Sequence, residues 1–326
     1  MVILVALPGM GKTEVAIRVG HLLQSGSWPV FFIEKQKNLL ELCEEILYRL
    51  TNRRWATSAN IVLHARRKLL ELKDDTVIIL DDTASVQGHV FDEFVEFLVS
   101  APKVRVIITT HENVGYISPG NIHNIRLVPL DLESSAELLT KLAPNSKKYA
   151  KKLAELCGGI PLFLNYASAL MIDGFCPKVF TQELRKNPSK FLKGTELLDT
   201  FYQKMGRFLL GKFSEEVLKN LVRLSVFPSS FSTDDIRFLF DDDYLLETVK
   251  TKLIQRGLLQ RINDELLSIH LLVQTYCREE RDSLNLVDLG RAVEHQFNRH
   301  YLELLRGLHK SFITKDSSSE IGRAHV

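Results

Sequence analysis

The sequence predicts an α/β protein in which a parallel β-sheet carries helices on both faces and is followed by a helical subdomain and a winged-helix domain. Three observations support this prediction. Short apolar runs alternate with segments of helical periodicity up to Pro129, the strand-like runs stop there, and a helix-helix-hairpin pattern surrounds residues 214–270.

Four short runs in the first part have the continuous apolar character of strands that are buried on both faces. They are Val2–Ala6, Val30–Ile33, Val77–Leu80 and Val104–Thr109. Between them, apolar residues recur at helical spacing in Lys12–Leu23, Leu39–Leu50 and Ile61–Leu72. This alternation favours parallel strands joined by right-handed crossovers. We assign residues 1–129 to this sheet domain.

Helical patterns dominate after Pro129. A helical subdomain, residues 130–210, is predicted from segments at Ser134–Leu142, Lys147–Cys157, Leu162–Ile172, Val179–Lys186 and Leu197–Leu210. A winged-helix domain, residues 211–283, is predicted from helices at Ser214–Val226, Asp234–Phe240 and Leu245–Gln255 and from a hairpin formed by Leu258–Arg261 and Leu266–His270. Ser232 is expected to be an N-cap. A helical segment is expected over 284–315.

Composition sets limits on the partners. The chain of 326 residues has 42 Lys and Arg, 40 Asp and Glu, and a net charge of +2, so nothing in its overall charge favours nucleic acid or an anionic membrane. The four cysteines are widely spaced, which favours a reduced, cytoplasmic setting. The longest apolar stretch, Ile160–Ile172, is too short to cross a bilayer.

The strongest motif is Ala6-Leu-Pro-Gly-Met-Gly-Lys-Thr13, which lies between a predicted strand and a predicted helix. This context is typical of a P-loop, in which backbone N–H groups and the helix N-terminus surround a phosphate. Ala6 replaces the usual first glycine. Lys12 is expected to contact the β- and γ-phosphates and Thr13 to bind Mg²⁺. The predicted nucleotide-binding residues here are Pro8, Gly9, Met10, Gly11, Lys12, Thr13 and Glu14.

Polar residues end two further predicted strands, where α/β sheets bind ligands. Asp81 is expected to hold Mg²⁺, directly or through water, and Asp82 to polarise the attacking water. Thr109 and Thr110 end the other strand, and we select Thr110 as a candidate γ-phosphate sensor. A plain strand end remains an equal explanation for both threonines.

Two motifs look structural when taken alone. Gly158-Gly-Ile-Pro161-Leu is a helix C-cap followed by a proline that starts the next helix. His270 ends the predicted hairpin.

Taken together, the P-loop, Asp-Asp, Thr-Thr, Gly-Gly-Ile-Pro-Leu, winged-helix and Ile-His-Leu motifs resemble the NB-ARC family of signal-transduction ATPases over about residues 2–282. The P-loop and the following Val19-Gly-His resemble animal members. The resemblance implies that Pro161 packs by the base and ribose and that His270 contacts the β-phosphate of ADP. Two departures are evident. His111 replaces the arginine of Thr-Thr-Arg, and Ile-His-Leu replaces Met-His-Asp.

The resemblance implies a molecular switch that binds ADP in a closed form and ATP in an open, self-associating form, with at most slow ATPase activity, in innate-immune or apoptotic signalling. Two alternatives stay open. One is an AAA-type ATPase whose winged helix binds DNA through Lys250, Lys252 and Arg256. The other is an interaction module that holds ADP without hydrolysing it.

The last residues have a different character. Residues 316–326 are expected to form a tail outside the fold, and Ile321-Gly-Arg-Ala-His-Val326 resembles the translation of a widely used sequencing adapter. We expect this tail to be an assembly artefact and exclude it from the fold.

Overall fold

A computed structural model describes residues 1–34, 38–53, 60–81, 83, 89–110, 122–186, 205–228, 230–240, 242–262, 266–281 and 285–313. The chain divides into two compact units, Met1–Pro129 and Leu130–Val326.

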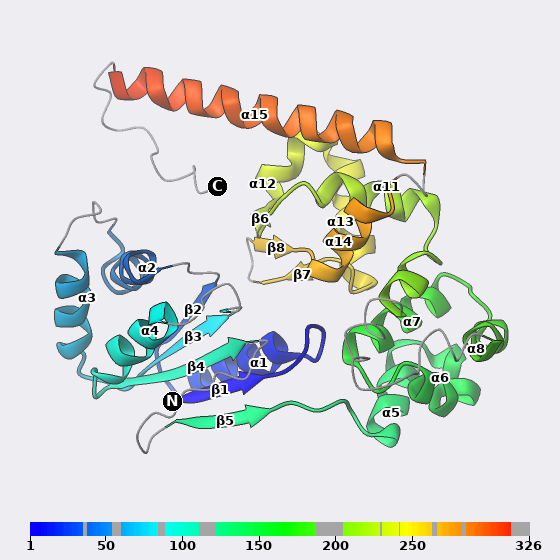
Figure 1. Ribbon diagram of the computed structural model, residues 1–326, viewed down its shortest axis with the longest axis horizontal. Coiled ribbons are helices and arrows are strands. Elements are labelled where there is room, and N and C mark those ends of the chain that lie inside the picture. The colour runs from blue at the N-terminus through cyan, green and yellow to red at the C-terminus, as the bar shows by residue number, and fades with distance from the viewer. Residues whose placement is uncertain are drawn as a thin grey trace. The chain divides into compact units, whose positions relative to one another are not determined.

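The first unit is a five-stranded sheet with helices on both faces (Figure 1). The strands occur in the order β2-β3-β4-β1-β5, and every neighbouring pair is parallel. Their bounds are β1 Val2–Val5, β2 Val30–Glu34, β3 Thr76–Asp81, β4 Val104–Thr110 and β5 His123–Arg126. The helices are α1 Lys12–Ser25, α2 Leu39–Thr51, α3 Ile61–Leu70 and α4 His89–Val99. The predicted fold class is confirmed.

Strand alternation divides the apolar residues of the sheet between two cores. On one face, Leu4, Val77, Ile79 and Ile107 pack with Ala16 of α1. On the other face, alternate strand residues pack with α2, α3 and α4, among them Ile3, Ile33, Ile78, Leu80 and Ile108. Because both faces are covered, β1, β3 and β4 appear as continuous apolar runs in the sequence.

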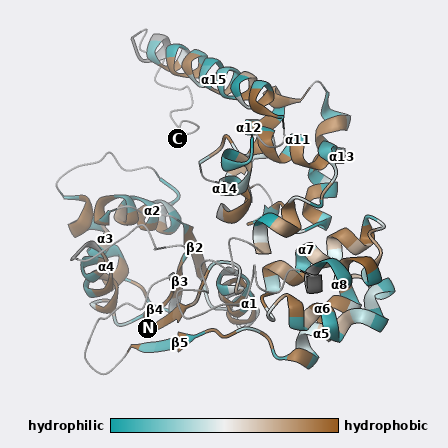
Figure 2. Cartoon of the chain, turned by 45° about the vertical axis from the view of Figure 1, so that its right-hand side comes forward, coloured by the Kyte–Doolittle hydropathy of each residue, from teal (hydrophilic) through white to brown (hydrophobic). Residues whose placement is uncertain are grey.

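Neither α4 nor β5 was anticipated from the sequence. All four residues of β5 are exposed, and the strand is largely hydrophilic (Figure 2). It lies at the edge of the sheet and pairs only with β1 among the described strands. A strand that buries no side chain leaves no hydrophobic signal in the sequence.

The second unit begins with a group of helices around α7. The bounds are α5 Leu132–Leu142, the 3₁₀ helix η2 Pro144–Tyr149, α6 Ala150–Leu156, α7 Pro161–Ile172 and α8 Pro177–Lys186. Nine of the 12 residues of α7 are buried. The predicted helix Lys147–Cys157 is therefore divided between η2 and α6. Residues 205–210 are helical, and the rest of the predicted Leu197–Leu210 helix lies outside the described residues.

A small three-stranded sheet with the strand order β6-β8-β7 forms the wing of the winged helix. The winged-helix domain comprises α11 Glu215–Leu224, β6 Phe231–Ser232, α12 Thr233–Ile236, η3 Arg237–Leu239, α13 Asp243–Gln255, β7 Gln260–Arg261, β8 Leu266–Ser268 and α14 Leu271–Glu279. Ser232 is the N-cap of α12, in a capping box with Asp235. The strand expected to reach His270 ends at Ser268, because His270 is the N-cap of α14.

A long helix, α15 Val287–Ile313, follows the winged helix. Its first half packs through aromatic rings: Phe297 contacts Phe227 edge to face, and His300 stacks on Phe238 at a centroid distance of 4.1 Å. Searching the described helices, we find none that is both long and apolar enough to cross a membrane. The predicted tail, 316–326, lies outside the described residues.

Candidate functional site

The loop between β1 and α1 has the conformation of an anion cradle. Gly9 and Gly11 adopt φ values of 77° and 86°, which only glycine adopts at little cost, and Gly11 is the N-cap of α1. The α1 N-terminus therefore opens on this loop with its unpaired N–H groups and its partial positive charge. The predicted P-loop residues are brought together here.

The Lys12 ammonium lies inside this loop. Its Nζ donates hydrogen bonds to the carbonyl oxygens of Ala6, at 2.7 Å, and Leu7, at 3.1 Å, and the residue is only 7% exposed. The lysine charge is thus held at the loop by backbone dipoles. Pro8, Gly9 and Met10 form the rest of the loop, whereas Glu14 is exposed on the first turn of α1.

Three oxygen-bearing side chains from three elements meet beside the loop. The Thr13 hydroxyl of α1 lies 3.0 Å from both carboxylate oxygens of Asp81, at the end of β3. The Thr109 hydroxyl of β4 donates to Asp81 Oδ1 at 2.6 Å. Asp81 and Thr109 are buried, and Thr83 donates to the Thr109 carbonyl at 3.1 Å. The pairing of β3 with β4 brings this group together.

Thr109, not Thr110, is the threonine that reaches the carboxylate. Alternation along β4 puts Thr109 on the face of α1, together with Ile107, and Thr110 on the opposite face, together with Ile108. From the sequence we selected Thr110 as the candidate sensor, but the strand register brings the Thr109 hydroxyl, not that of Thr110, to Asp81. Two other candidates, Asp82 and His111, lie outside the described residues.

The donor set fits Mg²⁺. Magnesium prefers oxygen ligands and usually retains several waters, so a threonine hydroxyl and a carboxylate that already contact one another are appropriate protein partners. Thr13 and Asp81 are the residues that would hold the ion.

Pro161 and His270 belong to the second unit. Pro161 is the first residue of α7, and it follows Gly158 and Gly159, which both have positive φ. Beside them, burial raises the pKa of the Cys157 thiol to about 12, so this cysteine is an unreactive core residue.

His270 caps α14 with its side chain: Nδ1 accepts a hydrogen bond from the Leu272 N–H at 3.1 Å. An accepting Nδ1 assigns the proton of the neutral ring to Nε2. This cap could not be predicted from the sequence, because histidine is not a usual N-cap residue.

The sheet order, the loop and the Thr13–Asp81 pair define the fold of a P-loop NTPase. The sequence matches no family model and no curated protein. Solved structures do match. A Signal Transduction ATPase with Numerous Domains (STAND) protein with a tetratricopeptide repeat sensor, from Pyrococcus horikoshii, has a TM-score of 0.57 and 18% identity, over 87% of this chain and 42% of that one.

Two DNA-associated proteins are also similar. The Drosophila ORC bound to DNA has a TM-score of 0.41 and 14% identity, over 85% of this chain and 81% of that chain. The Thermotoga maritima RuvB Holliday junction branch migration motor has a TM-score of 0.38 and 14% identity, over 85% and 86%. This chain spans less than half of the length of the STAND protein. At these identities the similarity shows the fold alone.

Proposed function

We propose that this chain is the nucleotide-binding core of an NB-ARC-type signalling switch, which holds ADP in a closed form and ATP in an open form. The observation that supports this most directly is the contact of Thr13 and Thr109 with Asp81 beside a loop that holds Lys12. The likeness in fold to a STAND protein agrees with it.

Different parts of the proposed site contact different parts of the nucleotide. The loop N–H groups and the α1 N-terminus bind phosphate oxygens, and Lys12 exchanges its carbonyl partners for the β- and γ-phosphates. Mg²⁺, when bound, neutralises charge on those phosphates. Thr109 already donates a hydrogen bond to Asp81, so a change in the ligands of that carboxylate alters a contact of β4. Asp82 is the proposed residue for orienting the attacking water, and Pro161 the proposed contact for the base and ribose.

Direct binding tests the proposal. The protein is expected to bind fluorescent ADP in preference to fluorescent GDP, and purified protein to release adenine nucleotide on denaturation. Single-turnover hydrolysis by the wild type and by Asp82→Asn then separates a slow ATPase from a module that only holds ADP. A chain that binds neither ADP nor ATP would contradict the proposal.

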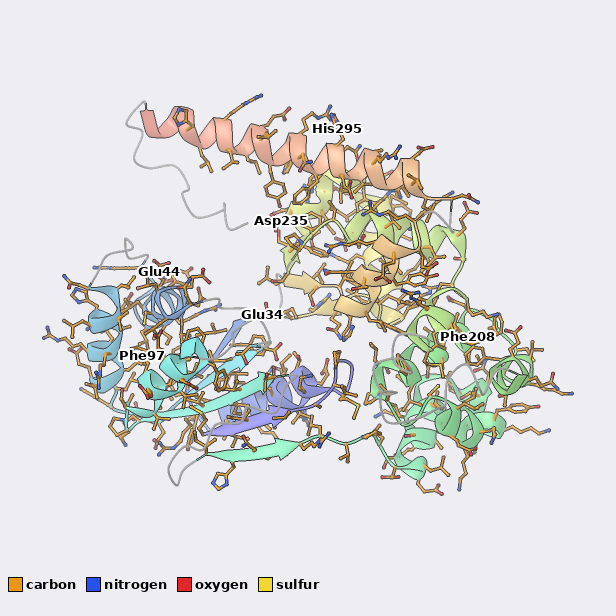
Figure 3. The ribbon with its side chains drawn as sticks, in the orientation of Figure 1. Glu34, Glu44, Phe97, Phe208, Asp235 and His295 are labelled. Atoms are coloured by element: carbon orange, nitrogen blue, oxygen red, sulfur yellow. The ribbon has the colours of Figure 1, made fainter. Side chains whose placement is uncertain are left out.

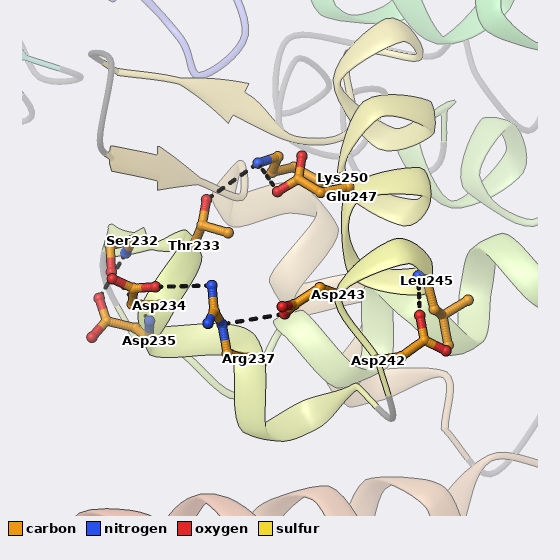
Figure 4. A network of polar contacts seen from close by, with 10 residues as sticks. All are labelled: Ser232, Thr233, Asp234, Asp235, Arg237, Asp242, Asp243, Leu245, Glu247 and Lys250. Atoms are coloured by element: carbon orange, nitrogen blue, oxygen red, sulfur yellow. Dashed lines mark hydrogen bonds and ion pairs between the residues drawn. The ribbon is translucent and has the colours of Figure 1, made fainter.

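The winged helix gives little support to the DNA-binding alternative. Lys250 bonds Glu247 and Thr233, Lys252 lies 3.9 Å from Glu216, and Arg256 pairs with Asp173. Acidic side chains crowd the same region, where Arg237 bridges Asp234 and Asp243 (Figure 4). Binding to DNA phosphates requires available basic side chains, whereas the described basic side chains here lie next to acidic ones.

The proposed role of His270 is to contact the β-phosphate through Nε2–H while Nδ1 caps α14. His270→Ala is therefore expected to speed ADP release and also to cost about 1 kcal/mol of stability through the lost cap. His270→Asn retains a good N-cap but lacks the imidazole donor. Stopped-flow release of fluorescent ADP should be fast in both variants, whereas the melting temperature should fall only in His270→Ala. Wild-type release rates in His270→Ala would exclude the phosphate contact.

A further inference from the structure

A second carboxylate lies next to Asp81 at the end of the sheet. β2 ends at Glu34, which Figure 3 labels. In the parallel register of β2 and β3, Glu34 is the direct partner of Asp81. Neighbouring strands in a sheet are about 4.8 Å apart. The two acidic residues are therefore adjacent in the sheet, although they lie far apart in the sequence.

Strand alternation places both side chains on the face of α1. Val30 and Phe32 of β2 pack with the Ala16 cluster on that face, whereas Ile33 belongs to the opposite core. Glu34, two residues after Phe32, returns to the α1 face. Asp81 follows Ile79 by the same two-residue step, and its contact with Thr13 of α1 agrees with this placement. Glu34 is half-buried.

The acceptor capacity of Asp81 is heavily used. Its two oxygens already receive two hydroxyls, from Thr13 and Thr109. Mg²⁺ in nucleotide sites keeps several waters, and each bound water needs acceptors for its protons. The Glu34 carboxylate, on the same face of the sheet and beside Asp81, can supply such acceptors.

We infer that Glu34 is a second acidic residue of the magnesium site, which accepts hydrogen bonds from the water shell of the ion and holds it next to Asp81. This inference rests on the proposed nucleotide-binding function. Glu34 is thus a positioning residue, because it acts on the phosphates through bound water. No motif in the sequence marks it, because only the register of β2 against β3 brings it to the site.

The test is a Mg²⁺ titration of fluorescent ATP binding by the whole chain. Loss of an outer-shell carboxylate typically weakens metal affinity by at least about tenfold, so Glu34→Gln should raise the half-saturating Mg²⁺ concentration by about that factor. Binding of ATP in EDTA should not change. Glu93→Gln is the matched control: it removes the same charge from an exposed position on α4, on the opposite face of the sheet, and should titrate like the wild type.

A second measurement separates this role from a merely structural one. If Glu34 and Asp81 hold one water shell, the effects of Glu34→Gln and Asp81→Asn on the Mg²⁺ midpoint should be less than additive in the double variant. A wild-type midpoint in Glu34→Gln, or fully additive effects, would overturn the inference while leaving the nucleotide switch intact. Failure of the wild type to bind ATP at any Mg²⁺ concentration would instead count against the proposed function.

Discussion

Replacing Gly159 with alanine is expected to destabilise the second unit by about 3 kcal/mol. Gly159 has a φ of 68°, where an L-residue costs roughly 1–2 kcal/mol. A Cβ atom there would lie 2.2 Å from the Leu130 carbonyl oxygen, so the backbone at residue 159 must move away from the backbone at Leu130. That movement strains the 2.9 Å hydrogen bond from the Leu130 N–H to the Gly159 carbonyl, which contributes about 1 kcal/mol.

Gly174 supplies the matched control. Its φ is 91°, but a Cβ built on it meets nothing within 4 Å. Gly174→Ala therefore carries only the conformational cost of about 1–2 kcal/mol. Thermal unfolding should show a clearly larger fall in melting temperature for Gly159→Ala. Equal shifts for the two variants would mean that the close approach to Leu130 is not a constraint.

The Gly159 contact gives the Gly-Gly-Ile-Pro-Leu segment a role beyond capping a helix. It anchors Leu130, the first residue of the second unit. On the other side, the Leu127 N–H donates to the Val5 carbonyl at 2.9 Å, within the first unit. Only Val128 and Pro129 lie between these two anchors.

Hydrophobic patterning was enough to find the four strands of the first unit that have apolar sequences. β1, β2, β3 and β4 each begin within one residue of the predicted start. β5 was not predicted, because its exposed residues make no apolar pattern. The 3₁₀ turn at η3 interrupted the helix expected over Asp234–Phe240, since periodicity does not distinguish a 3₁₀ turn from an α-helical one.

The candidate site was only partly visible in the sequence. Its P-loop is a contiguous motif, so the sequence alone was enough to predict that Lys12 and Thr13 lie at the phosphate-binding loop. The partners of Asp81 come from different strands, and which side chains face it depends on register and on alternation. A sequence of two threonines cannot show which of them faces Asp81. Glu34 could not be predicted as a site residue for the same reason, because only the register of β2 and β3 places it beside Asp81.

Lys12→Ala is expected to abolish adenine nucleotide retention, with a loss of affinity of at least about 100-fold. Charged hydrogen bonds contribute roughly 1.5–3 kcal/mol each, and about 1.4 kcal/mol corresponds to a factor of ten. The folded loop should survive without the lysine, because hydrogen bonds from its ammonium go to carbonyl oxygens five and six residues earlier in the same loop.

Because Lys12→Ala should lose nucleotide binding but keep its fold, thermal unfolding with and without ADP is the informative measurement. Ligand at 100 times its Kd stabilises a protein by about 2.7 kcal/mol, so the wild type should melt at a higher temperature with ADP. Lys12→Ala should melt near the ligand-free wild type under both conditions. Arg18→Ala removes one positive charge from the exposed side of the same helix and should keep the full ADP response. If Lys12→Ala retains that response, the anion bound by this loop does not depend on the lysine, and the P-loop assignment fails even though the loop has the right shape.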